Sequence, residues 1–214
     1  MPKSFRVDPD NPSAEVMNLA AKVLLDGGIV VFPTETVYGI GALADSRFGA
    51  HEIFEVKGRP TNLPIPLLVE TKDALGTWGA DVKEYAHRLA QEFWPGAVTL
   101  VVTASERVPK DFRAPNGTIG LRSPDHEVVR SLLQATGSPI FATSANTHKQ
   151  PAPGSFEEIE ARIITAADVV IDGGKSEHGT ASTVVLCTGD EPVVLREGAV
   201  SAEAIAEAAA ASVG

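Results

Sequence analysis

The 214-residue sequence contains one cysteine, few aromatic residues and fewer basic than acidic side chains. A single cysteine, Cys187, excludes an intramolecular disulfide framework. Because aromatic residues make up only 6% of the chain, the predicted core consists mainly of Val, Ile, Leu and Ala. The net charge of −10 opposes diffuse binding to nucleic acid, which requires a broad basic surface. It leaves room for an anionic ligand in a local basic pocket.

Long hydrophobic runs are also missing. No stretch reaches the roughly 20 apolar residues that a membrane-spanning helix needs, and Met1 to Asp10 lack the apolar centre of a signal peptide. We therefore expect a cytoplasmic protein that makes no membrane contact. Cys187 ends an apolar run that begins at Thr183, which predicts a buried and unreactive thiol.

The common catalytic signatures are missing as well. The sequence has no glycine-rich run ending in Gly-Lys-Ser/Thr, and no Rossmann fingerprint opens a helix after the first strand. Its five histidines include no pair with the spacing of metal ligands, and no serine lies in a Gly-x-Ser-x-Gly turn. We therefore expect no protein-bound metal, and the usual hydrolase and dehydrogenase chemistries lose support.

Helical and strand patterns alternate along most of the chain, which predicts one α/β domain over residues 1–214 with a mixed sheet and flanking helices. Predicted helices begin after Ser13, Asp81 and Asp125, after the capping box of Ser155 and Glu158, and near Ser201. A further helix is predicted from about Phe48 to Val56. The predicted strands are Ile29 to Phe32, Pro66 to Val69, Val98 to Val102, Thr118 to Leu121, Ile140 to Thr143, Val169 to Ile171, Thr183 to Leu186 and Val193 to Leu195. The close spacing of the last strands favours antiparallel pairing there.

Polar side chains follow several of these predicted strands, where α/β proteins place ligand sites. Lys57 and Arg59 offer a point charge beside a planar fork that suits phosphate, although cations are also typical of a solvated helix end. Ser144 and Asn146 could hold phosphate or ribose, although such residues also form caps and Asx-turns.

Two further arginines close apolar strands, Arg122 after Leu121 and Arg196 after Leu195. A charged residue there commonly marks only the return of the chain to solvent. Hydroxyl groups occur near the strand ends at Thr34, Thr36, Thr118, Ser182 and Thr183, where β-propensity is the simpler explanation for each alone. Four cations and several hydroxyls at strand ends of an acidic chain together predict an anion pocket.

A set of ordered motifs resembles the YrdC-like family, the threonylcarbamoyl-AMP synthases. These motifs are residues 33–41 (PTETVYGIG), 57–60 (KGRP), 94–96 (WPG), 120–124 (GLRSP), 144–146 (SAN), 182–185 (STVV) and 195–199 (LREGA). The resemblance extends from about Ala14 to Ile205, and it is to the short single-domain form of the family.

The resemblance implies a YrdC-like twisted α/β sheet around a deep basic cleft, and a nucleotidyltransferase reaction. L-threonine, bicarbonate and ATP would form L-threonylcarbamoyladenylate and release pyrophosphate. A partner tRNA-modifying transferase would then use the adenylate to make threonylcarbamoyladenosine, so this chain itself would contact tRNA weakly or indirectly. Mg²⁺ would be carried by the triphosphate.

The resemblance also implies roles for individual residues. Thr36, Arg122, Ser182 and the backbone at Ala142 would contact threonine, and Lys57 and Arg59 would be catalytic. The nucleotide contacts would be Lys57, Arg59, Asn62, Thr118, Ser144, Asn146 and Arg196. Catalysis would come from positioning and charge stabilisation, without a protein nucleophile. Neither Lys57 nor Arg59 is expected in the core.

The chain departs from the family pattern at two places. Glu70 stands where many relatives have a histidine that touches threonine, in a segment that is slightly longer here and also contains Asn62. Ala152 replaces a common serine, so any contact at that position would come from the backbone.

Two alternatives remain open at the level of sequence. A related module of hydrogenase-maturation proteins makes carbamoyl-adenylate, but it lies beside acylphosphatase and zinc-finger segments that this sequence lacks. A YrdC-like RNA-binding module would use the same cations, although the negative net charge and the scarcity of aromatic residues disfavour it.

Overall fold

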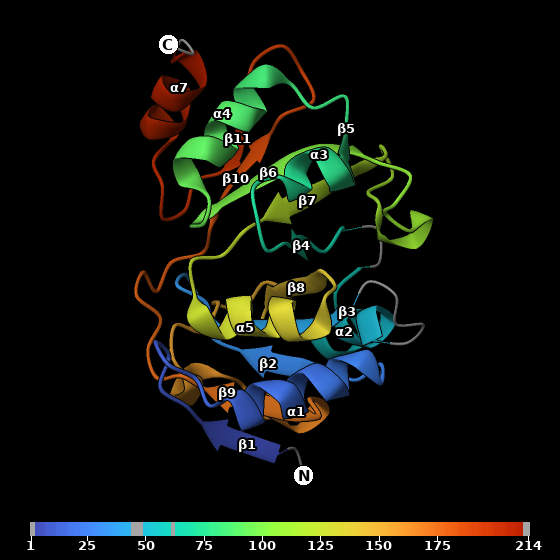
Figure 1. Ribbon diagram of the computed structural model, residues 1–214, viewed down its shortest axis with the longest axis vertical. Helices are drawn as coiled ribbons and strands as arrows, with labels where there is room; N and C mark the ends of the chain where they lie inside the picture. Colours follow the sequence, from blue (N-terminus) through green and yellow to red (C-terminus); the bar gives the residue numbers. More distant parts are fainter. Residues whose placement is uncertain (1–2, 44–48, 61–62, 212–214) are drawn as a thin grey trace.

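The computed structural model describes residues 3–43, 49–60 and 63–211. Its centre is an 11-stranded mixed sheet in the order β1-β9-β2-β3-β8-β4-β7-β6-β10-β11, with β5 paired to β6. Four strand pairs are parallel: β1 with β9, β9 with β2, β4 with β7 and β6 with β10. The predicted α/β class with a mixed sheet is therefore confirmed, and Figure 1 shows β4 between an upper and a lower group of strands.

The strands are β1 (Lys3–Arg6), β2 (Val30–Phe32), β3 (Gly39–Leu43), β4 (Leu67–Leu68), β5 (Gly79–Ala80), β6 (Val98–Ala104), β7 (Thr118–Arg122), β8 (Ile140–Ser144), β9 (Val169–Asp172), β10 (Thr183–Leu186) and β11 (Val193–Arg196). The α-helices are α1 (Ala14–Leu25), α2 (Gly49–Lys57), α3 (Ala74–Trp78), α4 (Glu84–Phe93), α5 (Glu127–Thr136), α6 (Ala161–Ala166) and α7 (Ala202–Ala210). Two 3₁₀ turns, Lys110–Phe112 and Phe156–Glu158, complete the elements. The predicted antiparallel pairing near the C-terminal end is confirmed by β10 and β11.

Several predicted boundaries were wrong, for local reasons. Residues Thr34 to Gly41 belong to no predicted strand, but the last three of them open β3, because Gly39 pairs with β2 and β8. The imidazole of His126, and not Asp125, accepts the backbone N–H of Val128 at the start of α5. The short elements β1, α3 and β5 carry no strong periodic pattern and were not predicted.

The expected caps at Asp81 and Ser155 do not form either. Asp81 has a φ of 50°, and the helix that it was expected to cap starts three residues later, as α4. Glu158 accepts the N–H of Gly154 and makes no capping box with Ser155. The single helix predicted after this box is instead a 3₁₀ turn followed by α6. The predicted helix start at Phe48 lies outside the described residues.

Strand β2 is buried on both faces, which explains its continuous apolar sequence. Val30 and Phe32 pack with the apolar side chains of α1 and α5, and Val31 packs into the larger core on the opposite face. Figure 1 shows α1 and α5 together in front of the lower strands, while α4 and α7 lie together at the upper end. In β6 and β7, alternate side chains pack into the core, and those on the opposite face line a cavity.

Cys187 is 2% exposed, and burial raises the pKa of its thiol to about 12. The predicted burial of this thiol is thus confirmed. Within the described part of the chain, no helix combines the length and the apolar character needed to cross a membrane.

Gly198 lies where β11 returns toward the segment that precedes β10. A Cβ atom at this position would stand 2.0 Å from the carbonyl oxygen of Ala181 and 2.6 Å from the carbonyl carbon of Ser182. We expect Gly198→Ala to lower the free energy of unfolding by about 2 kcal/mol, since backbone must move to admit the methyl group. The matched control is Gly189→Ala, whose Cβ would meet nothing closer than 3.7 Å, and urea unfolding of both variants tests the difference.

Candidate functional site

A cavity of about 540 Å³ lies on the face of the sheet opposite α4. Its floor follows the alternation of side chains along a strand. Thr118, Gly120 and Arg122 of β7 line the cavity, whereas the intervening Ile119 and Leu121 are buried in the core. In β6 the same rule brings Thr99 and Val101 to the cavity.

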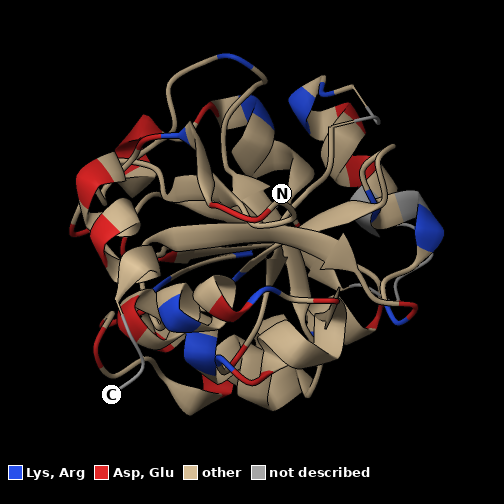
Figure 2. Cartoon of the chain, turned by 90° about the horizontal axis from the view of Figure 1, so that it is seen from above, with Lys and Arg blue, Asp and Glu red and all other residues tan. Residues whose placement is uncertain are grey.

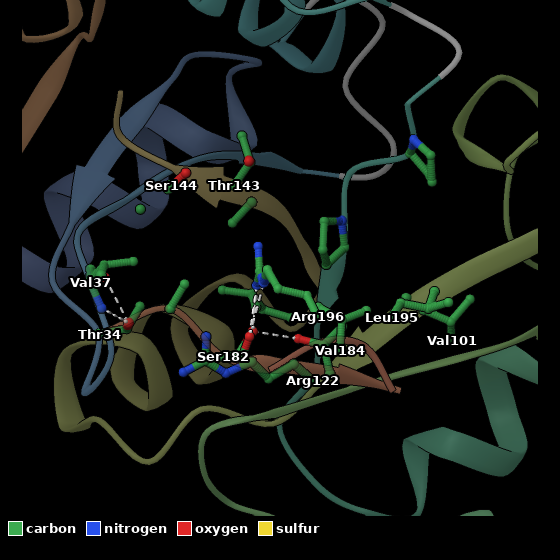
Figure 3. A pocket seen from close by; sticks show the side chains of 18 of the residues that line it. Thr34, Val37, Val101, Arg122, Thr143, Ser144, Ser182, Val184, Leu195 and Arg196 are labelled. Atoms are coloured by element: carbon green, nitrogen blue, oxygen red, sulfur yellow. Dashed lines mark hydrogen bonds between the residues drawn. The ribbon is translucent and has the colours of Figure 1, made fainter. Parts of the chain in front are cut away.

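Three arginines from separate parts of the chain line this cavity: Arg59 follows α2, Arg122 ends β7 and Arg196 ends β11. Figure 3 shows Arg122, Ser182 and Arg196 on one side of the pocket, and Thr143 and Ser144 of β8 on the other. Figure 2 shows charged segments mainly on the outer helices and loops, with few on the central strands. The convergence of these three guanidinium groups therefore stands out from the distribution of charge in the rest of the protein.

The three arginines influence one another. Burial lowers the pKa of Arg59, and the charge of Arg196 lowers it further. Burial and the neighbouring Arg122 do the same to Arg196. The guanidinium of Arg59 donates to the carbonyls of Leu63 and Pro64, and that of Arg196 donates to Ser182. Neither forms an ion pair with a carboxylate among the described residues, so their positive charge is not balanced within the cavity wall.

Arg122 is held differently. Its Nη2 donates to Glu35 Oε1 at 2.7 Å and to the hydroxyl of Thr36 at 2.9 Å, while Nε donates to the carbonyl of Gly96. The side chains of Arg122 and Glu35 are 8% and 4% exposed. In the part of the chain that the structure describes, Nη1 has no hydrogen-bond partner. Arg122 is thus a fixed cation with one free donor group in a cavity wall.

Thr36, expected to contact threonine, is fully buried and is not part of the cavity wall. Its hydroxyl lies 2.8 Å from that of Thr34, which donates to the carbonyl of Val37. The Thr34 hydroxyl also accepts the backbone N–H groups of Thr36 and Val37, and the hydroxyl of Thr36 accepts from Arg122. The hydroxyl of Thr36 therefore helps to orient the guanidinium.

Lys57 was expected to lie outside the core, but it is buried and only 1% exposed. Its Nζ donates to the carbonyl of Ser144, to the carbonyl of Asn146 at 2.6 Å and to the Asn146 side chain at 3.2 Å. Burial, together with the charge of Arg59, lowers the pKa of Lys57 to about 7. The Lys57 side chain thus anchors the end of β8 and the segment that follows it. Ser144 lines the cavity, whereas Lys57 and Asn146 do not.

The remaining predicted contacts gather at the same place. Thr118, Ala142 and Ser182 all line the cavity. The hydroxyl of Thr118 donates to Asn116, and that of Ser182 lies 2.9 Å from the hydroxyl of Thr99. Asn62 lies outside the described residues.

The two departures from the family pattern do not reach the cavity. The carboxylate of Glu70 accepts a hydrogen bond from Gln134 of α5 and lines a second, separate cleft beside α3 and α5. Ala152 is not part of the cavity wall either. Glu70 therefore does not reach the cavity, and Leu68 is the β4 residue that does.

Sequence reasoning missed Thr99 and Glu35. Thr99 is a buried polar residue at an alternate position of an otherwise apolar strand, and this alternation could have placed it on the cavity side. Glu35 lies inside a motif but was given no role, because no sequence pattern pairs it with Arg122, 87 residues away.

The sequence matches the Sua5/YciO/YrdC family, described as telomere recombination, over residues 22–198. Threonylcarbamoyl-AMP synthase of Pyrococcus abyssi is 37% identical over 88% of this chain, and that of Bacillus subtilis is 35% identical over 87%. The chain spans 56% and 54% of the lengths of these two relatives, about half of each. The crystal structure of P. abyssi Sua5 complexed with L-threonine superposes with a TM-score of 0.90 at 34% identity, and covers 97% of this chain and 60% of that one.

These matches include the segments that carry the clustered arginines and the anchored β8 loop, since residues 22–198 contain all of them. The family expected from the ordered motifs is thereby confirmed. This chain belongs to the Sua5/YciO/YrdC family.

Proposed function

We propose that this chain is a threonylcarbamoyl-AMP synthase, a nucleotidyltransferase that acts as a single domain over residues 1–214. The observation that carries the proposal is the convergence of Arg59, Arg122 and Arg196 with serine and threonine hydroxyls on one cavity. Relatives of that name are 35% to 37% identical to this chain, and a similar structure holds L-threonine.

We assign different groups of the cavity wall to the two substrates. Arg122, with its free Nη1, would donate to the carboxylate of L-threonine, and Ala142 and Ser182 would complete the amino-acid site. Arg59, Thr118, Ser144 and Arg196 would bind ATP, and Arg59 would stabilise the charge that develops on the phosphates. Lys57 and Asn146 would act through Ser144, because neither reaches the cavity.

The reaction needs no protein nucleophile. The threonine nitrogen bonds to the carbon of bicarbonate with loss of water and gives a carbamate. A carbamate oxygen then attacks the α-phosphorus of ATP, and the bond to pyrophosphate breaks. The guanidinium groups hold the reacting oxygens and phosphates close together and offset the developing charge.

No Asp or Glu occurs among the described residues that line the cavity, and no group of three acidic, histidine or cysteine side chains there could hold a metal ion. Mg²⁺ would therefore be bound by the phosphate oxygens of ATP and by water. The product adenylate would pass to a tRNA-modifying transferase in the cytoplasm, where both ATP and tRNA occur. The negative net charge favours a weak or indirect contact with tRNA.

Pyrophosphate release from ATP tests this proposal. We expect release only when L-threonine and bicarbonate are both present, because the carbamate is the nucleophile toward the α-phosphorus. L-Alanine is the matched control, since it offers the same amine and carboxylate without the hydroxyl. Equal turnover with L-alanine, or with no amino acid, would contradict the threonine assignment.

A further inference from the structure

The three cations of the cavity differ in how their charge is balanced. Arg59 and Arg196 are hydrogen-bonded to carbonyl or hydroxyl oxygens, whereas Arg122 forms a buried ion pair with Glu35. Within the described residues, this is the one ion pair that any of these three arginines makes. The same cavity wall therefore carries unbalanced positive charge at Arg59 and Arg196 and a balanced ion pair at Arg122.

Glu35 is well placed for a purely electrostatic role. It is 3% exposed and does not line the cavity, so it is separated from any ligand by Arg122. Its Oε2 is buried and makes no hydrogen bond to any described residue, which means that the carboxylate is not fully used in holding the fold. Burial lowers the pKa of the nearby His126 against the field of Glu35, so at neutral pH Arg122 is the cation that balances this carboxylate.

We propose that Glu35 determines which arginines of the cavity accept phosphate: by balancing Arg122 it reserves that residue for a zwitterionic amino acid and leaves Arg59 and Arg196 for a polyphosphate. This inference rests on the proposed function, since it takes L-threonine and ATP as the two ligands.

The physical reason is the difference in charge between the two ligands. A triphosphate or pyrophosphate gains most where positive charge is unbalanced, and in a sheltered cavity such differences are larger than in water. A zwitterion carries no net charge. Its carboxylate can accept from Nη1 of Arg122, while its ammonium meets a neutral Arg122–Glu35 pair in place of a third unbalanced cation. Without the carboxylate, Arg122 would join the other two arginines as a third phosphate site.

The experiment measures the binding of L-threonine by calorimetry with and without saturating inorganic pyrophosphate. For the wild type we expect the dissociation constant of L-threonine to change by less than about twofold. For Glu35→Gln, which keeps the shape and loses the charge, we expect pyrophosphate to raise it by about tenfold or more, because pyrophosphate now competes at Arg122. Glu35→Asp, which keeps the charge, should behave like the wild type, as should Glu106→Gln at an exposed turn.

Turnover gives a second readout that a merely structural role would not move. Glu35→Gln should show inhibition by high ATP that added L-threonine relieves. Competition of pyrophosphate with L-threonine in the wild type would overturn the inference by itself, even if Glu35→Gln failed to fold. Pyrophosphate-independent binding in a folded Glu35→Gln would also overturn it and leave the proposed function intact. If the wild type binds no L-threonine at all, the proposed function fails instead.

Discussion

Lys57→Met is expected to reduce pyrophosphate release by at least about 100-fold, because the segment that carries Ser144 loses its anchor and small displacements of catalytic groups are costly. The substitution keeps the length and the apolar stem of the side chain but removes the donor from three acceptors on Ser144 and Asn146. Since these acceptors are in a buried region, we also expect a loss of about 2–3 kcal/mol in the free energy of unfolding. Initial rates and urea unfolding measure the two effects.

Arg59→Met is the matched control for this prediction. Arg59 is partly exposed, and its described hydrogen bonds go to the carbonyls of Leu63 and Pro64. We expect the free energy of unfolding to change by no more than about 0.5 kcal/mol, whereas turnover should fall by about 100-fold or more through the loss of phosphate stabilisation. A Lys57→Met protein with unchanged stability would contradict the anchoring role.

Arg122→Met is expected to abolish threonine-dependent turnover and to destabilise the protein by about 3–5 kcal/mol, because Glu35 remains as a buried and unbalanced carboxylate. The loss of the cation that binds the substrate carboxylate explains the first effect, and the loss of the ion pair explains the second. Both are measured as for Lys57→Met, with the dissociation constant of L-threonine as a further readout.

The double variant Arg122→Met with Glu35→Gln separates these two effects. With the carboxylate removed, about half of the lost stability or more should return, since no unbalanced charge is left in the core. Turnover should stay absent, since the cation that binds the substrate carboxylate is still missing. A double variant that regained turnover with its stability would show that Arg122 serves the fold alone.

Much of the fold followed from local patterns. The apolar run at Val30 to Phe32 predicted a buried strand, and the structure places it between two cores. The elements that were missed are short: β5 has two residues, and β1 is a four-residue edge strand. Their pairing partners are distant in sequence, and a tertiary contact rather than an intrinsic propensity makes them strands.

The chain itself determined which groups are available: arginines and hydroxyls at strand ends, ordered motifs of a family, and an acidic remainder. Only the tertiary structure decided which groups reach the cavity and which support it from behind. Thr36, Lys57 and Asn146 lie outside the wall, and Glu35 balances one of three clustered arginines. These roles depend on burial and on the distances between segments as far apart as β3, β7 and β11, and neither quantity is encoded in a local stretch of sequence.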